Sequence, residues 1–96
     1  MITHVVMIKL KDPTSENVDK AVRKIRELDG QIEVLKSLKV GADIVRSERS
    51  YDLALIARFE NLADLKTYNK HPVHVPVLEY IGGLASAVAA VDFEIE

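Results

Sequence analysis

The sequence predicts an α+β fold in which strands and helices follow one another in the order β-α-β-β-α-β. Three observations support this prediction. The chain has 96 residues, a length that suits one domain spanning 1–96. Two segments repeat apolar residues at the spacing of a helix, and four segments alternate with the two-residue period of a strand. In this order the strands form an antiparallel four-stranded sheet with both helices on one face.

The first predicted strand runs from Ile2 to Leu10. His4 and Val6 share one face of this strand, and Val5 and Met7 share the other. A half-exposed antiparallel strand would place polar residues on its second face. Both faces are apolar in the middle here, so we expect both to be covered.

The first predicted helix follows a turn at Pro13. Thr14 or Ser15 is its expected N-cap, with Glu16 favourable in the first turn. Its apolar stripe consists of Val18, Ala21, Val22, Ile25 and Leu28. Gly30 is the expected C-terminal stop.

Two strands are predicted in the middle of the chain, over residues 35–41 and 51–60, with a polar loop between them. The second of these alternates most clearly, and one of its faces carries Tyr51, Leu53, Leu55, Ala57 and Phe59. Its other face is partly apolar through Ala54 and Ile56.

The second predicted helix begins after Asn61, and Pro72 ends it near Lys70. A short helical piece is expected from Pro76 towards Tyr80, with two glycines ending it. The last strand is predicted over residues 85–96, where Val91 and Phe93 alternate with acidic residues.

The apolar second faces of the strands predict a partner. Val5 and Met7 on the first strand, and Ala54 and Ile56 on the third, lie opposite the face that the helices can cover. A second copy of the chain would cover them in a homodimer whose two sheets pack face to face.

Composition excludes several classes of function. Hydrophobic residues make up 48% and charged residues 29% of the chain, which is typical of a globular protein. The net charge of −2 argues against nucleic-acid binding, and the absence of cysteine excludes disulfides and thiol nucleophiles. With no long apolar run and no signal-peptide pattern, we expect a cytoplasmic protein with no membrane partner.

The three histidines are the sharpest chemical signal. His71 and His74 flank Pro72 at the helix break, and Tyr68 lies one turn earlier. If the second helix covers the first strand, His4 comes near Tyr68 and His74. Two imidazoles and a phenol in an apolar pocket are the parts of a general acid–base site.

Two other interpretations of the histidines stay open. The imidazoles can serve structure alone, with His4 in the core and the other two bonded to carbonyls freed at the helix break. Three imidazoles can also bind zinc. Pro72 disturbs the helical spacing of His71 and His74, however, and no carboxylate lies close by in sequence, so we predict no metal site.

The sequence resembles the stress-responsive dimeric α/β-barrel (Dabb) family along essentially its whole length. The resemblance rests on the opening residues 4–11, on 51–52, on the Tyr-x-x-His-Pro-x-His segment at 68–74, and on 91–93. The segment at 68–74 is the most specific of these. The resemblance implies a ferredoxin-like monomer and a homodimeric α+β barrel.

The family's function is mostly unassigned, and its best understood enzyme is a plant polyketide cyclase, olivetolic acid cyclase. That enzyme performs an aldol cyclisation without a cofactor or metal. Its catalytic histidine matches His74, its assisting tyrosine matches Tyr68, and a pocket histidine matches His4. Residues 75–87 are rich in alanine and glycine here, where the cyclase carries bulkier side chains, so the substrate need not be the same.

The leading hypothesis is therefore a cofactor-independent, cyclase-like enzyme that acts on a small carbonyl substrate between the helices and the sheet. His74 is the base, Tyr68 orients the carbonyl, and His4 and His71 contact the substrate. One alternative is a non-catalytic, stress-induced or small-molecule-binding dimer, and a second is a monooxygenase-like dimeric α+β barrel.

Overall fold

The computed structural model describes residues 1–95. Its elements are β1 (Ile2–Leu10), α1 (Ser15–Arg26), β2 (Ser37–Ala42), β3 (Leu53–Phe59), α2 (Leu62–Asn69), α3 (His74–Leu84) and β4 (Ala85–Glu94). The predicted order of strands and helices is confirmed, with the second helical region divided into α2 and α3. The end of the last predicted strand, residue 96, lies outside the described residues.

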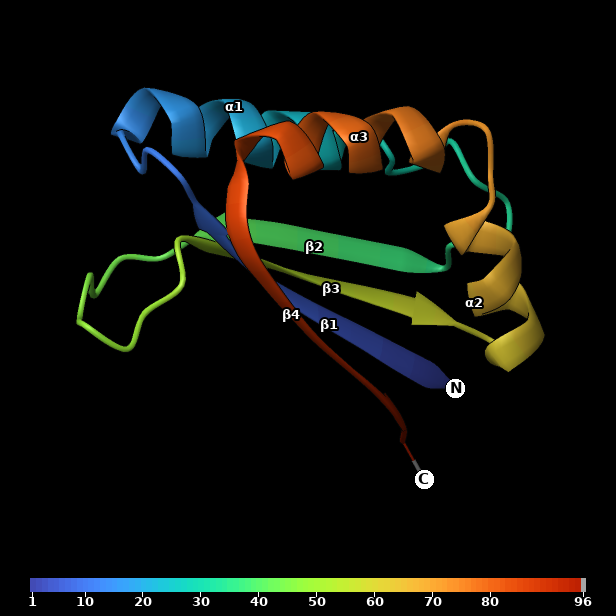
Figure 1. Cartoon of the computed structure of the whole chain (residues 1–96). Coiled ribbons are helices and arrows are strands. Elements are labelled where there is room, and N and C mark those ends of the chain that lie inside the picture. The colour runs from blue at the N-terminus through green and yellow to red at the C-terminus, as the bar shows by residue number, and fades with distance from the viewer. Residues whose placement is uncertain (96) are drawn as a thin grey trace.

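The four strands form one antiparallel sheet in the order β2-β3-β1-β4. Helices α1 and α3 lie side by side over one face of this sheet, and α2 stands at the end of β3 (Figure 1). This is the predicted ferredoxin-like arrangement. It places the first and last strands next to each other, beneath α3.

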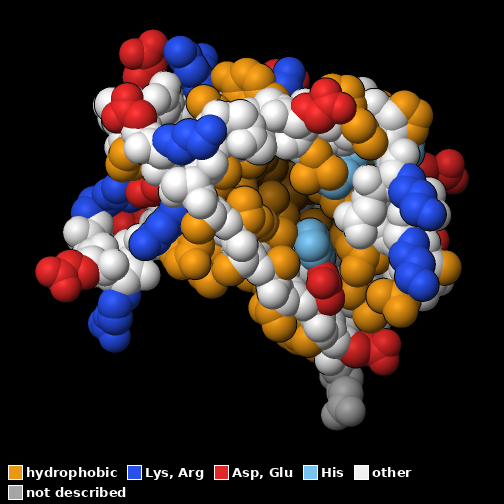
Figure 2. All heavy atoms as spheres, in the orientation of Figure 1, with side chains coloured by type: hydrophobic (Ala, Val, Ile, Leu, Met, Phe, Trp, Pro, Cys, Tyr) orange, Lys and Arg blue, Asp and Glu red, His pale blue; other side chains and the backbone are white. Residues whose placement is uncertain are grey.

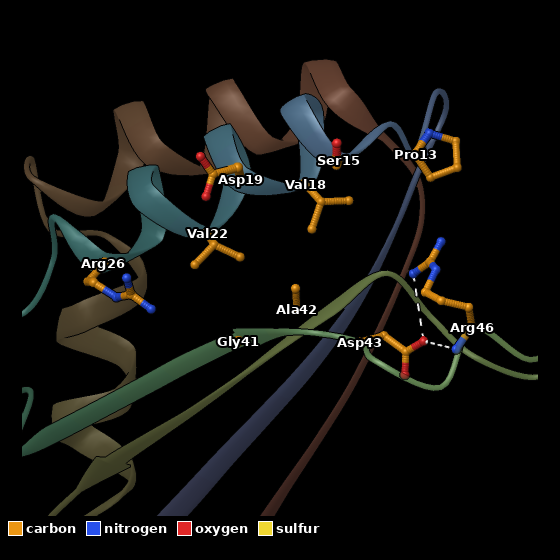
Figure 3. A pocket seen from close by; sticks show the side chains of 10 residues that line it. All are labelled: Pro13, Ser15, Val18, Asp19, Val22, Arg26, Gly41, Ala42, Asp43 and Arg46. Carbon is orange, nitrogen blue, oxygen red and sulfur yellow. Dashed lines mark hydrogen bonds and ion pairs between the residues drawn. The ribbon is translucent and has the colours of Figure 1, made fainter.

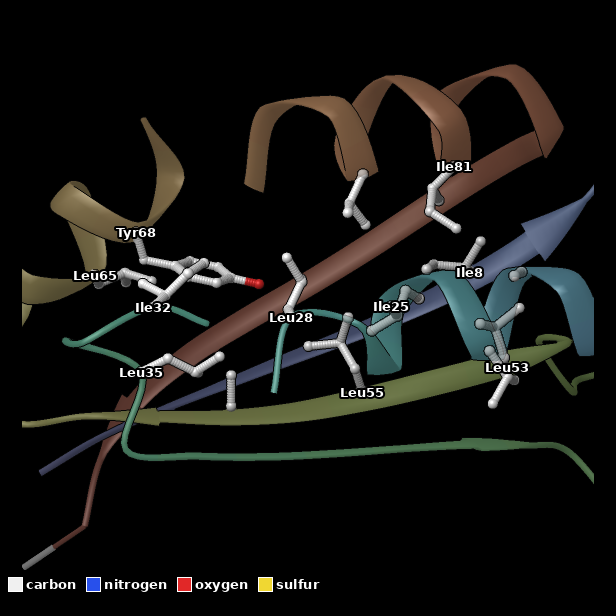
Figure 4. Packing of buried hydrophobic residues seen from close by; sticks show 14 of the residues in the cluster. Ile8, Ile25, Leu28, Ile32, Leu35, Leu53, Leu55, Leu65, Tyr68 and Ile81 are labelled. Atoms are coloured by element: carbon white, nitrogen blue, oxygen red, sulfur yellow. The ribbon is translucent and has the colours of Figure 1, made fainter. Parts of the chain in front are cut away.

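The core fills the space between the sheet and the helices (Figure 4). The strands contribute every second residue to it, namely Ile8, Leu10, Leu53, Leu55, Ala57 and Phe59. The predicted stripe of α1 faces these residues, and all five of its members are buried. Burying a large aliphatic or aromatic side chain stabilises a fold by about 1.5–3 kcal/mol, so this face determines how the helices sit.

The N-terminal caps of α1 and α2 agree with the sequence. The hydroxyl of Thr14 accepts a hydrogen bond from the Asn17 backbone N–H at 3.1 Å. The side-chain oxygen of Asn61 accepts one from the Asp64 N–H at 2.9 Å. Helix α1 ends at Arg26, before the predicted stop, and Gly30 instead forms the following turn with a φ of +77°.

Helix α3 is longer at both ends than the predicted piece from Pro76 towards Tyr80. It begins at His74, so Pro76 lies in its first turn, where a missing N–H breaks no helical hydrogen bond. It also runs through Gly82 and Gly83 to Leu84. The prediction that these glycines end the helix was wrong: neither has a positive φ, and the helix continues until the Ala85 N–H donates to the Ile81 carbonyl.

The middle strands differ by one or two residues from their predicted bounds, and a buried carboxylate lies just before β3. Asp52 is 6% exposed and accepts hydrogen bonds from the Leu10 backbone N–H at 2.7 Å and the Arg46 guanidinium at 2.8 Å. Burial alone would raise the pKa of Asp52, but these two donors outweigh it and hold the pKa below its ordinary value.

The sheet face opposite the helices is apolar and open. Val5 pairs with Ile56 and Met7 with Ala54, and by alternation these residues lie on the face opposite the core residues of the same strands. Val91 and Phe93 of β4 share this face. Met7 is 41% and Ile56 is 42% exposed.

None of the helices in residues 1–95 has the length and apolar character needed to cross a membrane.

Candidate active site beneath helix α3

Four rings gather where α2 and α3 meet the sheet. The centroids of the Tyr68 and His74 rings are 4.0 Å apart, and those of Phe59 and Tyr68 are 4.9 Å apart. The ring of His4 lies 6.3 Å from that of Tyr68. The structure therefore brings together the three residues His4, Tyr68 and His74 that the sequence grouped.

The break between α2 and α3 positions Tyr68 and His74. Tyr68 lies in the last turn of α2, and His74 is the first residue of α3. A tight turn joins them: the His71 N–H donates to the Tyr68 carbonyl at 3.1 Å, and the His74 N–H donates to the His71 carbonyl at 2.9 Å. This turn stacks the imidazole of His74 on the phenol ring.

His74 is held as a neutral base. It is 7% exposed, and its Nδ1 lies 3.3 Å from the carbonyl oxygen of Asn69. A carbonyl can only accept, so Nδ1 carries the proton and Nε2 keeps the lone pair. Burial lowers the pKa of His74, the bond to Asn69 opposes this, and positive charge on His4 and His71 adds to the lowering.

The pKa of Tyr68 is shifted in the direction opposite to that of His74, because the same surroundings bury both groups. It is 1% exposed, and burial raises the pKa of its phenol to about 12. The phenol therefore keeps its proton at neutral pH and can donate a hydrogen bond. Figure 4 shows its hydroxyl directed into the space beneath α3, on the side of Leu28.

His4 has a partner that the sequence analysis missed. Its Nδ1 is hydrogen-bonded to the carboxylate of Asp92, which lies directly opposite it in the β1–β4 pairing. The carboxylate holds the imidazole in one orientation and leaves Nε2 as its second, free nitrogen. The sequence does show an acidic residue, Asp92, on the helix-facing side of an apolar strand. Its pairing with His4, however, follows only from the register between β1 and β4.

A cavity of about 150 Å³ adjoins Tyr68 and His74. Apart from these two its lining is apolar, and consists of Ile8, Ile25, Leu28, Leu55, Val77, Leu78, Ile81, Gly82 and Val88. Figure 2 shows a hollow with largely hydrophobic walls between α3 and β4, and imidazole and acidic side chains lie near it. His4 is not part of the lining, so the predicted pocket contacts two of its three residues.

His71 lies apart from this cavity. Its Nδ1 accepts a hydrogen bond from the Val73 backbone N–H at 3.1 Å, within the break itself. A substrate contact by His71 stays a prediction. In residues 1–95 no three His, Asp or Glu side chains lie close enough together to share a metal ion.

A larger cavity, of about 470 Å³, lies on the other side of α1 (Figure 3). Val18 and Val22 point into it from α1, towards Ala42. At one end the Asp43 carboxylate accepts a hydrogen bond from the Arg46 N–H at 2.7 Å. Its lining contains no histidine, tyrosine or buried carboxylate, so we place the candidate active site at the smaller cavity.

Comparison with protein families agrees with this fold. The sequence model of the stress responsive A/B barrel domain family, Dabb, matches residues 2–95. The chain belongs to the Dabb family. Comparison with curated proteins gives no match.

Solved structures similar to this Dabb protein include two dimers of unknown function. A ferredoxin-like protein from Bacteroides fragilis is 29% identical, with 98% of this chain and 95% of that chain covered and a TM-score of 0.85. One from Thermobifida fusca is 26% identical, with 98% and 90% covered and a TM-score of 0.87. Both share the fold, and both are dimeric.

A third similar structure is a hydroxynitrile lyase from Passiflora edulis. It is 15% identical, with 99% of this chain and 93% of that chain covered and a TM-score of 0.84. At this identity the likeness concerns the fold of the Dabb protein, and fold alone does not assign function.

Proposed function

We propose that this Dabb protein is a cofactor-independent enzyme that performs acid–base chemistry on a small carbonyl compound. The observation that carries the proposal is the stacked pair of Tyr68 and His74, 4.0 Å apart at the wall of an apolar cavity. One shared environment keeps the imidazole neutral and the phenol protonated. Pairs of groups whose pKa values are pushed apart in this way are the usual sign of an acid and a base.

The proposed reaction is of the aldol type. Nε2 of His74 takes a proton from the carbon next to a carbonyl, and the electron pair of the broken C–H bond forms an enolate. The hydroxyl of Tyr68 donates a hydrogen bond to the enolate oxygen, where negative charge develops. The enolate carbon then bonds to a second carbonyl carbon, and the resulting alkoxide takes the proton back from His74.

The pair of His4 and Asp92 supports this base from the neighbouring strand. His4 lies beside Tyr68, and positive charge on His4 is one of the causes that lower the pKa of His74. Asp92 fixes the ring of His4 without entering the cavity lining. We assign His4 the role of tuning the base, with Asp92 as its positioning residue.

We further propose that the protein acts as a homodimer through the open sheet face. Two observations support this: the relatives with 29% and 26% identity are dimeric, and the open face carries exposed apolar side chains. A single domain over residues 1–96 and a cytoplasmic location stay predictions from the sequence.

Proton exchange tests the catalytic proposal without knowledge of the natural substrate. Acetophenone in D₂O should exchange its methyl protons faster with the protein than with buffer, as followed by NMR. His74→Gln should remove this acceleration, because glutamine keeps the volume but has no basic nitrogen. Lys70→Gln changes an exposed residue of the same helix break and should keep the acceleration. Equal exchange with wild type and His74→Gln would refute the proposal.

A non-catalytic binding protein is the second candidate. The bonds from His74 to the Asn69 carbonyl and from Val73 to His71 favour it, because both tie the imidazoles to the helix break. In that case His74→Gln should lower stability by about 1–3 kcal/mol and leave ligand binding intact. Urea unfolding and a ligand titration of the same variant separate the two candidates.

A further inference from the structure

Gly82 occupies a position that does not require glycine. It lies inside α3, where glycine is less favourable than alanine. It is not among the glycines with a positive φ, and a Cβ built on it would meet no atom within 4 Å. Neither backbone conformation nor packing within the described chain accounts for the missing side chain.

The place of Gly82 in the helix points to the cavity. His74, Leu78 and Gly82 are spaced four residues apart on α3, so they form one row, and all three line the cavity. Across from this row lies Val88 of β4, which is 58% exposed, while Leu78 is 51% exposed. These exposed lining residues mark the mouth of the cavity.

A side chain at position 82 would narrow that mouth. Side chains on a helix point back towards its N-terminus and cover the preceding turn. A leucine in place of Gly82 would therefore extend towards Leu78, across the gap that faces Val88. The absent side chain keeps this gap open.

The lining also restricts what can enter. An apolar cavity of about 150 Å³ is large enough for a molecule the size of benzene. Its lining includes no charged side chain, so an anion would lose its hydration without gaining a partner. Tyr68 and His74 supply the polar side chains of the lining, so one polar group of the ligand can be recognised.

Resting on the proposed function, we propose that Gly82 is the specificity-determining residue of this site. It admits neutral, compact and largely apolar carbonyl compounds of about one six-membered ring. The carbonyl lies at Tyr68 and His74, and the apolar body lies towards Ile25 and Ile81.

Binding of acetophenone and benzoate to paired variants tests this inference. Gly82→Leu should weaken acetophenone binding by about tenfold or more in an NMR titration. Gly83→Leu is the matched control. Gly83 also lies in the last turn of α3, and a Cβ built on it would also meet no atom within 4 Å, but Gly83 does not line the cavity. This variant should bind acetophenone as the wild type does. Benzoate should bind none of the three detectably. Gly82→Ala serves as a milder variant if the leucine disturbs folding.

Three outcomes overturn the inference: no acetophenone binding to wild type, equal weakening by both leucine variants, or benzoate binding as tight as acetophenone. The proposed function fails separately. If binding depends on Gly82 but His74→Gln leaves proton exchange unchanged, the specificity assignment stands and the catalytic proposal falls. If proton exchange depends on His74 but the Gly82→Leu variant binds acetophenone and exchanges its protons normally, the catalytic proposal stands and the specificity assignment falls.

Discussion

At the scale of single residues, one apolar environment has opposite effects on two neighbouring side chains. Burial disfavours the charged form of each group, and for His74 that form is the protonated one while for Tyr68 it is the deprotonated one. The pKa of the imidazole therefore falls and that of the phenol rises. The site thus holds a base and an acid that do not neutralise each other at pH 7.

Removing the Tyr68 hydroxyl should affect catalysis more than folding. Tyr68→Phe keeps the buried ring and its contacts with Phe59 and His74. It removes the donor proposed to stabilise the enolate, so the exchange of acetophenone should slow by about 10²-fold or more. The melting temperature should stay close to that of wild type. Unchanged exchange would remove Tyr68 from the mechanism.

The pH dependence of exchange follows from the two pKa shifts. The pKa of His74 lies below 6.5, the ordinary value for histidine. The neutral, basic form of the imidazole therefore persists at pH 6.5 and is lost only as the pH falls through the lowered pKa. The phenol keeps its proton up to a pKa of about 12. After subtraction of the buffer rate, the protein-catalysed exchange rate should therefore be flat from neutral pH to about pH 10. An acid limb centred above 6.5 would contradict the assignment.

The candidate site was only partly predictable from the sequence. The motif at 68–74 identified Tyr68 and His74, because the proline between the two histidines predicts a helix break and places both residues beside it. Asp92 was missed because its partner His4 lies 88 residues away, and only the β1–β4 register joins them. Gly82 was taken as a helix stop, since the sequence does not show that a cavity lies beside it.

At the scale of elements, a buried carboxylate connects three segments of the chain. Asp52, just before β3, accepts hydrogen bonds from the backbone of β1 and from Arg46 in the preceding loop. Arg46 has a positive φ of 58°, which the bonds to Asp43 and Asp52 help to hold. Asp52 thus makes side-chain contacts that periodicity cannot reveal, whereas the caps Thr14 and Asn61 depend only on neighbours in sequence.

Neutralising Asp52 should lower stability in a pH-dependent way. Its folded pKa lies below 3.8, so its contribution is present above that pH and is lost as pH falls through the folded pKa. Asp52→Asn should cost about 1–3 kcal/mol at pH 7, because the amide oxygen can accept only one of the two hydrogen bonds and the amide NH2 then faces the other donor. In urea unfolding, the difference from wild type should shrink as the pH falls below 3.8. The exposed Asp29→Asn is the control and should show no such trend.

At the scale of the whole molecule, the fold leaves two kinds of apolar surface with different expected uses. One lies beneath α3 and forms the small cavity, and the other is the sheet face opposite the helices. Alternation in the strands predicted the open face, since β1 is apolar on both faces, whereas the cavity was expected from the grouping of Tyr68 with the histidines. The identity of what covers the open face depends on a second molecule, and the dimeric relatives point to a second copy of the chain.

Placing a charge on the open face should dissociate that dimer. Ile56 pairs with Val5 at the centre of this face, and Ile56→Asp would bury an unpaired carboxylate between the two sheets. The dissociation constant should rise by about 100-fold or more, which light scattering at micromolar concentration detects as a shift from dimer to monomer. Ile44→Asp is the matched control, because Ile44 is 91% exposed on the loop between β2 and β3 and lies outside the sheet. It should leave the dimer intact. A monomeric wild type would refute the dimer itself. An Ile56→Asp chain that stays dimeric with unchanged stability would show that another surface joins the subunits, because a carboxylate cannot be sealed between apolar sheets without a measurable cost.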